Sequence, residues 1–252
     1  MNFNQAFVIL KNASDAHDAK IILEHFPKMG RIRLWRIARQ LRRGVPVAKI
    51  IHEKWFYGLK FYTDKNTLDP RPDSETLVDA ALGADGDRVL DIGTGTGCLV
   101  CAIVKNKKDA SGVGIDISWR ARCIAQKNVQ SLNMGARIKI IYGDFNKPMN
   151  MGKFDIIVSN PPYIARGDTR VNRGALNDPK IALYAGADGL DAYRAIAKNA
   201  YNLLNSDGRI FLEIGLGQMR AVRKIFADKN WKFVKFYRDL GGVIRVLEFS
   251  LK

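Results

Sequence analysis

The sequence predicts an α/β protein, in which a doubly wound, seven-stranded, mostly parallel sheet follows a small helical domain. Two patterns predict it. From residue 73 onward, short runs rich in branched residues alternate with helix-length segments. Before residue 55, apolar residues recur at helical spacing. With 252 residues, 47% of them apolar, the chain can bury one substantial core and a small second one.

Three regions are expected along the chain. Residues 1–54 form the helical domain, with helices over 16–26 and 32–41. Residues 55–72 form a hairpin linker, since aromatic residues alternate with polar ones there. Residues 73–252 form the sheet domain. Its strands are expected at 89–92, 112–117, 138–142, 154–159, 210–214, 233–237 and 243–251.

The formal net charge of +16 indicates an acidic or polyanionic partner. Nine lysines and arginines against one acid lie between Lys28 and Lys54. On the second helix one face is apolar, and Arg36, Arg39 and Arg43 form a second face, called here the basic stripe. Two interpretations stand: a solvated face, or a docking surface for RNA or an acidic protein.

The remaining composition favours a cytoplasmic protein. No run of about 18 apolar residues suggests a transmembrane helix, and the apolar stretch in residues 1–10 is too short for a secretory leader. The three cysteines cannot all pair, which favours a reducing compartment. Cys98 and Cys101 lack the further ligands of a zinc site, so no metal is expected and both should pack on a helix.

Three strand ends predict a nucleoside ligand. The first strand runs into a G-x-G-x-G loop, which lets the backbone approach a ligand closely: Gly93, Thr94, Gly95, Thr96 and Gly97. The second strand ends at Asp116, 19 residues after Gly97, where a carboxylate can accept both ribose hydroxyls. The third is followed by Asp144, a partner for an adenine amine, and by Phe145, a ring to stack on the base.

The fourth strand ends in Asn160, Pro161, Pro162 and Tyr163. This motif suits methylation of an amide or amino nitrogen, a poor nucleophile whose lone pair is delocalised. Acceptors on its N–H bonds would orient it and stabilise the developing charge, and the Asn160 side chain and the Pro161 carbonyl offer two. The prolines restrict the loop, and Tyr163 can pack on the flat target group.

The whole chain resembles the HemK/PrmC family of protein-(glutamine-N5) methyltransferases, which modify peptide-chain release factors. Asp91 to Gly97 and Asn160 to Tyr163 are shared with many amino-methyltransferases, including those acting on adenine in DNA. Three further segments are more specific to this family and keep its order: the helical domain's Gly44-Val-Pro46-Val-Ala, then Asp69-Pro-Arg-Pro-Asp-Ser-Glu-Thr76, then Asp188-Gly-Leu-Asp-Ala-Tyr-Arg194.

The resemblance implies a Rossmann-like S-adenosylmethionine-dependent methyltransferase, with S-adenosylhomocysteine as product. Its substrate would be the Gly-Gly-Gln glutamine of class I release factors. The glycine loop would hold the methionine part, Asp116 the ribose, and Phe145, with Asp144, the adenine. The loop from Asn160 to Tyr163 would grip the glutamine, with Asn160 also touching the cofactor.

The sequence departs from the family at two places. Asn177-Asp178-Pro179 replaces an aromatic-Glu-Pro segment, keeping the acid and the proline but losing the ring, and Ser74 replaces a threonine.

Two other functions remain open. The charge and the shared Asn160 to Tyr163 motif also fit an adenine or guanine amino-methyltransferase of RNA or DNA, although no long insertion that could recognise DNA follows Tyr163. An inactive RNA-binding or assembly factor is disfavoured, because Asp91, Asp116 and Asn160 are all present.

Overall fold

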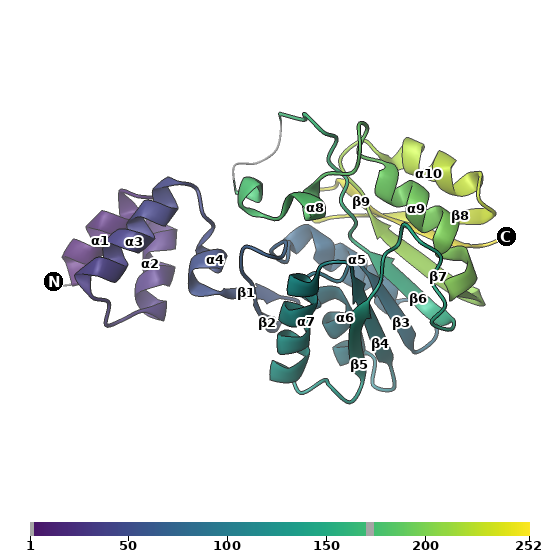
Figure 1. Cartoon of the computed structure of the whole chain (residues 1–252), viewed down its shortest axis with the longest axis horizontal. Coiled ribbons are helices and arrows are strands. Elements are labelled where there is room, and N and C mark those ends of the chain that lie inside the picture. Colours follow the sequence, from purple (N-terminus) through teal and green to yellow (C-terminus); the bar gives the residue numbers. More distant parts are fainter. Residues whose placement is uncertain (1–2, 170–173) are drawn as a thin grey trace.

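The structure, a computed structural model, describes residues 3–169 and 174–252. The first four helices form a small bundle set apart from the sheet (Figure 1): α1 (Phe3–Lys11), α2 (Ala16–His25), α3 (Arg31–Arg42) and α4 (Val47–Ile51). Asp15 caps α2 by accepting a hydrogen bond from the Asp18 amide (2.8 Å). Leu10, Ile22 and Leu34 are fully buried in the bundle core.

A two-stranded hairpin joins the bundle to the sheet domain. It consists of β1 (Glu53–Phe56) and β2 (Leu59–Tyr62), paired antiparallel around Tyr57 and Gly58, both of which have positive φ. Phe56 and Phe61 pack the hairpin against the sheet domain, and the buried Asn128 side chain bonds it there. The Asn128 amide accepts from the Tyr62 N–H (2.7 Å) and donates to the carbonyls of Tyr62 (3.0 Å) and Thr96 (2.9 Å).

The sheet domain confirms the predicted fold class. Its seven strands have the spatial order β5-β4-β3-β6-β7-β9-β8; β7 pairs antiparallel with β9, as does β8, and the other pairs are parallel. The strands are β3 (Arg88–Ile92), β4 (Ser111–Asp116), β5 (Ile138–Tyr142), β6 (Phe154–Ser159), β7 (Leu204–Glu213), β8 (Trp231–Arg238) and β9 (Ile244–Leu251). β7 begins earlier than predicted, because Leu204 already pairs with Phe154. An irregularity in the pairing follows, over an Asn-Ser-Asp-Gly stretch whose polar residues are typical of a turn.

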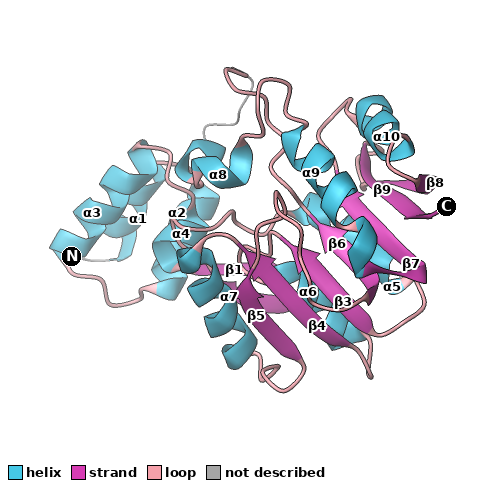
Figure 2. Cartoon of the chain, turned by 45° about the vertical axis from the view of Figure 1, so that its right-hand side comes forward, coloured by secondary structure: helices cyan, strands magenta, loops and turns pink. Residues whose placement is uncertain are grey.

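Helices cover both faces of the sheet (Figure 2). The larger ones are α5 (Glu75–Leu82), α6 (Cys98–Asn106), α7 (Trp119–Ser131), α9 (Asp191–Asn199) and α10 (Met219–Ala227); shorter turns are η1 (Pro72–Ser74), η2 (Ala175–Asn177), α8 (Lys180–Leu183) and η3 (Tyr201–Leu203). Val89 packs in one core with α5 and α6, whereas its neighbour Leu90 packs in a second core with α9 and α10. Because both faces are covered, ligands can reach the sheet at the loops after its parallel strands. None of the helices in the described ranges is long and apolar enough to cross a membrane.

Candidate functional site

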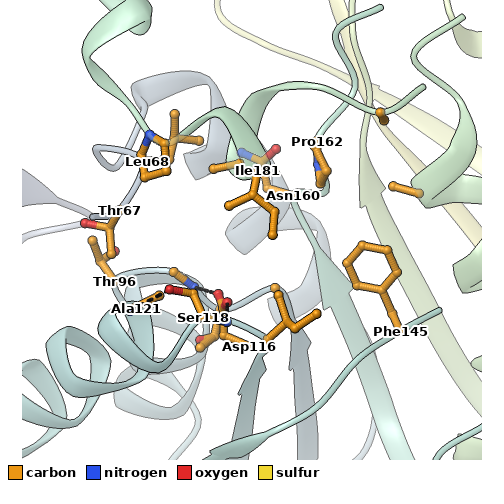
Figure 3. A pocket seen from close by; sticks show the side chains of 18 of the residues that line it. Thr67, Leu68, Thr96, Asp116, Ser118, Ala121, Phe145, Asn160, Pro162 and Ile181 are labelled. Atoms are coloured by element: carbon orange, nitrogen blue, oxygen red, sulfur yellow. Dashed lines mark hydrogen bonds between the residues drawn. The ribbon is translucent and has the colours of Figure 1, made fainter. Parts of the chain in front are cut away.

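A cavity of about 380 Å³ lies where β3, β4, β5 and β6 end (Figure 3). Most of the residues singled out from the sequence line it: Gly93, Thr94, Gly95, Thr96, Asp116, Asp144, Phe145, Asn160 and Pro162. Gly97, Pro161 and Tyr163 are not among its lining residues. Pro179, Ile181 and Ala182 form part of another wall.

The glycine loop turns with two residues in the left-handed region, Gly93 (φ 74°) and Gly95 (φ 55°). A Cβ placed on Gly93 would meet no atom within 4 Å, so open space remains beside the backbone for a ligand. Gly97 also has a positive φ (81°), but a Cβ there would meet Ala125 of α7 at 3.4 Å. The positive φ, more than the space beside it, is therefore what requires glycine at position 97.

Asp116 is fixed beside this loop by hydrogen bonds from two backbone amides. Oδ2 accepts from the Gly95 N–H (3.0 Å) and Oδ1 from the Ser118 N–H (2.8 Å). Burial raises the pKa of Asp116, and these two bonds, with the charge of Arg122, oppose the rise. Each carboxylate oxygen keeps a further lone pair with which to accept a hydroxyl.

Asn160 follows β6 and is held by side chains from two other elements. Its Nδ2 donates to Ser74 Oγ (3.0 Å), and Ser74 Oγ donates to Glu213 Oε2 (2.5 Å). Ser74 and Glu213 are 3% and 2% exposed. Burial raises the pKa of Glu213 to about 7, although hydrogen bonds from Ser74 and Asn160 oppose the rise. Glu213 was not predicted from the sequence. The pattern that could have indicated it is an acidic residue at the end of an apolar strand segment.

The loop after Asn160 is held in place by contacts to the Tyr163 carbonyl. Gln218 Nε2 donates to the Tyr163 carbonyl (2.9 Å), and a Cβ on Gly189 (φ 75°) would lie 2.4 Å from the same oxygen. The close approach of Gly189 explains the glycine in the Asp188 to Arg194 segment. The Tyr163 ring packs on the sheet-domain core, and burial raises its pKa to about 12.

The Asn177-Asp178-Pro179 segment connects the cavity wall to the helical bundle. Asn177 Nδ2 donates to the Gly44 carbonyl (2.8 Å). Asp178 pairs with Lys49 of α4 (2.8 Å) and with Arg71 (2.7 Å). Lys49 also pairs with Asp69 (3.0 Å), and these four charged residues are called the Lys49 cluster. This contact joins distant segments of the chain and could not be predicted from the residues alone.

On α3 the two expected faces are present. Leu34, Ile37, Ala38 and Leu41 are buried, while Arg36, Arg39 and Arg43 are exposed. Cys98 and Cys101 lie on α6 as free thiols, and the described residues contain no group of three potential metal ligands.

Comparison with known proteins identifies the family. The chain is 38% identical over 218 residues to the release factor glutamine methyltransferase of Cereibacter sphaeroides, covering 86% of this chain and 76% of that protein. It is 40% identical over 230 residues to the one from Agrobacterium fabrum, covering 85% and 78%. The chain belongs to the release factor glutamine methyltransferase family. Residues 68–186 also match the family model described as methyltransferase small domain.

Solved structures agree on the fold of this family member. The catalytic domain of hMettl16 superposes with a TM-score of 0.62 at 16% identity, covering 84% of this chain and 82% of that one. A methyltransferase from Pyrococcus furiosus gives 0.59 at 18% identity, covering 85% and 96%. At these identities the likeness concerns the fold alone.

As a member of this family the chain is an S-adenosylmethionine-dependent methyltransferase, and the cavity fits that cofactor. Asp116 offers acceptors for the ribose hydroxyls, and the Phe145 ring lies at the cavity wall (Figure 3). Asp91 is fully buried beneath the glycine loop, with Oδ2 accepting from Thr94 Oγ1 (2.7 Å). Its Oδ1 has no hydrogen-bond partner in the described part of the chain, and burial raises the pKa of Asp91 to about 7. A cationic amino group nearby would compensate this carboxylate.

Proposed function

We propose that the chain methylates the side-chain amide nitrogen (N5) of the glutamine in the Gly-Gly-Gln motif of class I peptide-chain release factors. The relatives named for this activity match most of the chain. The observation that carries the proposal is the position of Asn160, an amide side chain on the wall of the cavity that also contains Asp116 and Phe145.

The chemistry required of the protein is mainly positioning. The bound cofactor supplies a methyl group on a sulfonium, which is already a good leaving group. The glutamine nitrogen bonds to the methyl carbon as the carbon–sulfur bond breaks, and the nitrogen releases one proton to water. Asn160 Oδ1 and the Pro161 carbonyl accept from the target N–H bonds, so they orient the nitrogen and stabilise its developing positive charge.

Within this proposal, Pro162 and Ile181 form cavity walls on either side of Asn160 (Figure 3). Gly93 to Gly97 hold the methionine part of the cofactor, and Asp144 the adenine amine. Tyr163 acts through its carbonyl, which Gln218 anchors, and this keeps the Asn160 to Tyr163 loop in place. Access to release factors places the enzyme in the cytoplasm.

The basic stripe is proposed as the docking surface for the release factor. Its arginines are exposed on the helical bundle, which the Lys49 cluster attaches to the cavity wall. An acidic partner surface would complement this charge. Contact with RNA through the same arginines is the alternative, and the charge-reversal experiment described in the Discussion distinguishes the two.

An adenine or guanine amino-methyltransferase of RNA or DNA is the second candidate function, favoured by the net charge of +16. Transfer of labelled methyl groups to release factor, tRNA, rRNA and DNA separates the candidates, with mass spectrometry locating the modified residue. We expect label on the Gly-Gly-Gln glutamine. Label on a nucleic acid base, with none on release factor, would replace the proposal with the second function.

A further inference from the structure

Three polar side chains from distant segments meet at the cavity: Ser74 and Asn160 line it, and Glu213 lies behind them. Ser74 ends η1, Asn160 follows β6, and Glu213 ends β7. The order of donors is fixed by the carboxylate: Ser74 donates its single proton to Glu213, so it presents a lone pair to Asn160. Burial raises the pKa of Glu213, and the Asn160 side chain opposes this rise, as expected of an amide N–H that lies close to the carboxylate.

This arrangement distinguishes the two ends of the Asn160 amide. An asparagine amide has nearly the same shape after a 180° rotation, so hydrogen-bond partners decide which end faces where. Here Nδ2 faces Ser74 and Glu213, and no residue within 3–169 or 174–252 donates to Oδ1. The rotated amide would present N–H groups to the N–H groups of a glutamine, which is repulsive.

We infer that Glu213 and Ser74 are positioning residues, which hold the Asn160 amide with its oxygen towards the target nitrogen. The inference rests on the proposed function, because it assigns Oδ1 as an acceptor for the substrate amide. It adds two residues to the machinery, neither of which is expected to touch the glutamine.

The charges around Glu213 make the arrangement sensitive to pH. Asp73 of η1 and Arg245 of β9 act on the carboxylate with opposite signs, and Tyr163 and Tyr193 lie close enough to interact with it. The Tyr193 hydroxyl bonds the Glu213 carbonyl (2.9 Å), not the side chain. A protonated Glu213 can donate to Ser74, which frees the serine proton for Oδ1 of a rotated Asn160. Turnover should therefore fall as the pH drops below about 7.

A double-mutant cycle tests the inference. With saturating S-adenosylmethionine and intact release factor, Glu213→Gln and Ser74→Ala should each lower kcat about tenfold, within the range found for outer-shell partners of metal sites. Ser74→Thr keeps the hydroxyl and should keep activity. In an Asn160→Ala background, Glu213→Gln should cause no further loss, because there is no amide left to orient.

Three further measurements separate positioning from a structural role. Calorimetry should show unchanged affinity for S-adenosylmethionine in both variants. The decline of kcat below about pH 7 should be present in the wild type and absent in Glu213→Gln. Glu248→Gln is the matched control, since Glu248 is also a buried acid with a hydrogen-bonded hydroxyl, Tyr237 (2.7 Å), but it is not linked to Asn160 through Ser74. This control should retain turnover.

The possible failures are distinct. If the wild type does not methylate release factor, the proposed function is wrong. If the wild type is active, two results overturn the inference: full activity of both Ser74→Ala and Glu213→Gln, or equal loss from Glu213→Gln with and without Asn160. Should Glu213→Gln not fold, Ser74→Ala decides the question in the same cycle.

Discussion

Replacing Lys49 with methionine should strongly destabilise the protein. The Lys49 ammonium is 4% exposed and lies 2.8 Å from Asp178 and 3.0 Å from Asp69, whose side chains are 1% and 5% exposed. It also donates to the Asp64 carbonyl (2.7 Å). Removing one partner of a buried ion pair costs about 3–5 kcal/mol. Because Arg71 still pairs with Asp178 (2.7 Å), we expect about 3 kcal/mol, the lower end.

Urea denaturation followed by circular dichroism and tryptophan fluorescence measures the loss in unfolding free energy. Lys20→Met is the matched control, since Lys20 forms an exposed pair with Glu24 in the same bundle (3.8 Å). That substitution should change the unfolding free energy by less than about 1 kcal/mol.

The deficit of Lys49→Met should depend on pH. Burial raises the pKa of Asp178, and Lys49 opposes the rise, so the variant should raise this pKa further. A raised carboxyl pKa in the folded state means that stability is lost as pH rises and is regained in acid. The difference from wild type should therefore be largest where the carboxylates are fully ionised and should shrink as the pH is lowered. A loss no greater than that of Lys20→Met, or a deficit that grows in acid, would refute this account of the cluster.

Three further predictions concern the cavity and the bundle. Asp116→Ala should weaken S-adenosylmethionine binding by about 1.5–3 kcal/mol, and unchanged calorimetric affinity would remove Asp116 from the site. Asn160→Ala should lower turnover about a hundredfold with little change in thermal stability; near-normal turnover would refute its role. Reversing the charge of Arg36, Arg39 and Arg43 together should slow association with release factor more than methyl transfer, and salt should shrink the difference, as charges are screened over about 10 Å at about 0.1 M. A glutamine peptide should react equally with both enzymes. If association with release factor is unchanged, the basic stripe is only a solvated face. If the variant loses RNA binding and nothing else, the basic stripe is an RNA-binding surface.

The sheet was predictable from the sequence because its strands are short runs rich in branched residues, and β3, β4, β5 and β6 each end at or near a residue type that suits a ligand. The glycine loop and Asp116 are local signals of this kind. The bundle was less clear: α1 and α4 were not assigned separately, since short helices carry little periodicity. β7 was predicted too short, because polar residues interrupt its apolar pattern.

The contacts behind the site could not be predicted. Ser74 and Glu213 are 139 positions apart, and Arg71 and Asp178 are 107 apart. Only the folded chain places them together, and a serine or a lysine gives no sequence signal of the partner it will meet. Asn177-Asp178-Pro179 illustrates this. The sequence shows only that this segment departs from the family's aromatic-Glu-Pro pattern, whereas the structure shows its acid paired with Lys49 of the helical bundle.

The bundle and the sheet domain are joined at two separate places, at the hairpin, which Asn128 of α7 holds, and at the Lys49 cluster. A single flexible linker would let α3 sample many distances from Asn160, whereas two attachments set one. The two attachments thus constrain the distance between α3 and Asn160. If the release factor docks on α3 as proposed, it could present to Asn160 only a loop that protrudes at the matching distance. Under the proposed docking on α3, the distance between α3 and Asn160 would select one glutamine of the partner, and the residues beside that glutamine would need to contribute little.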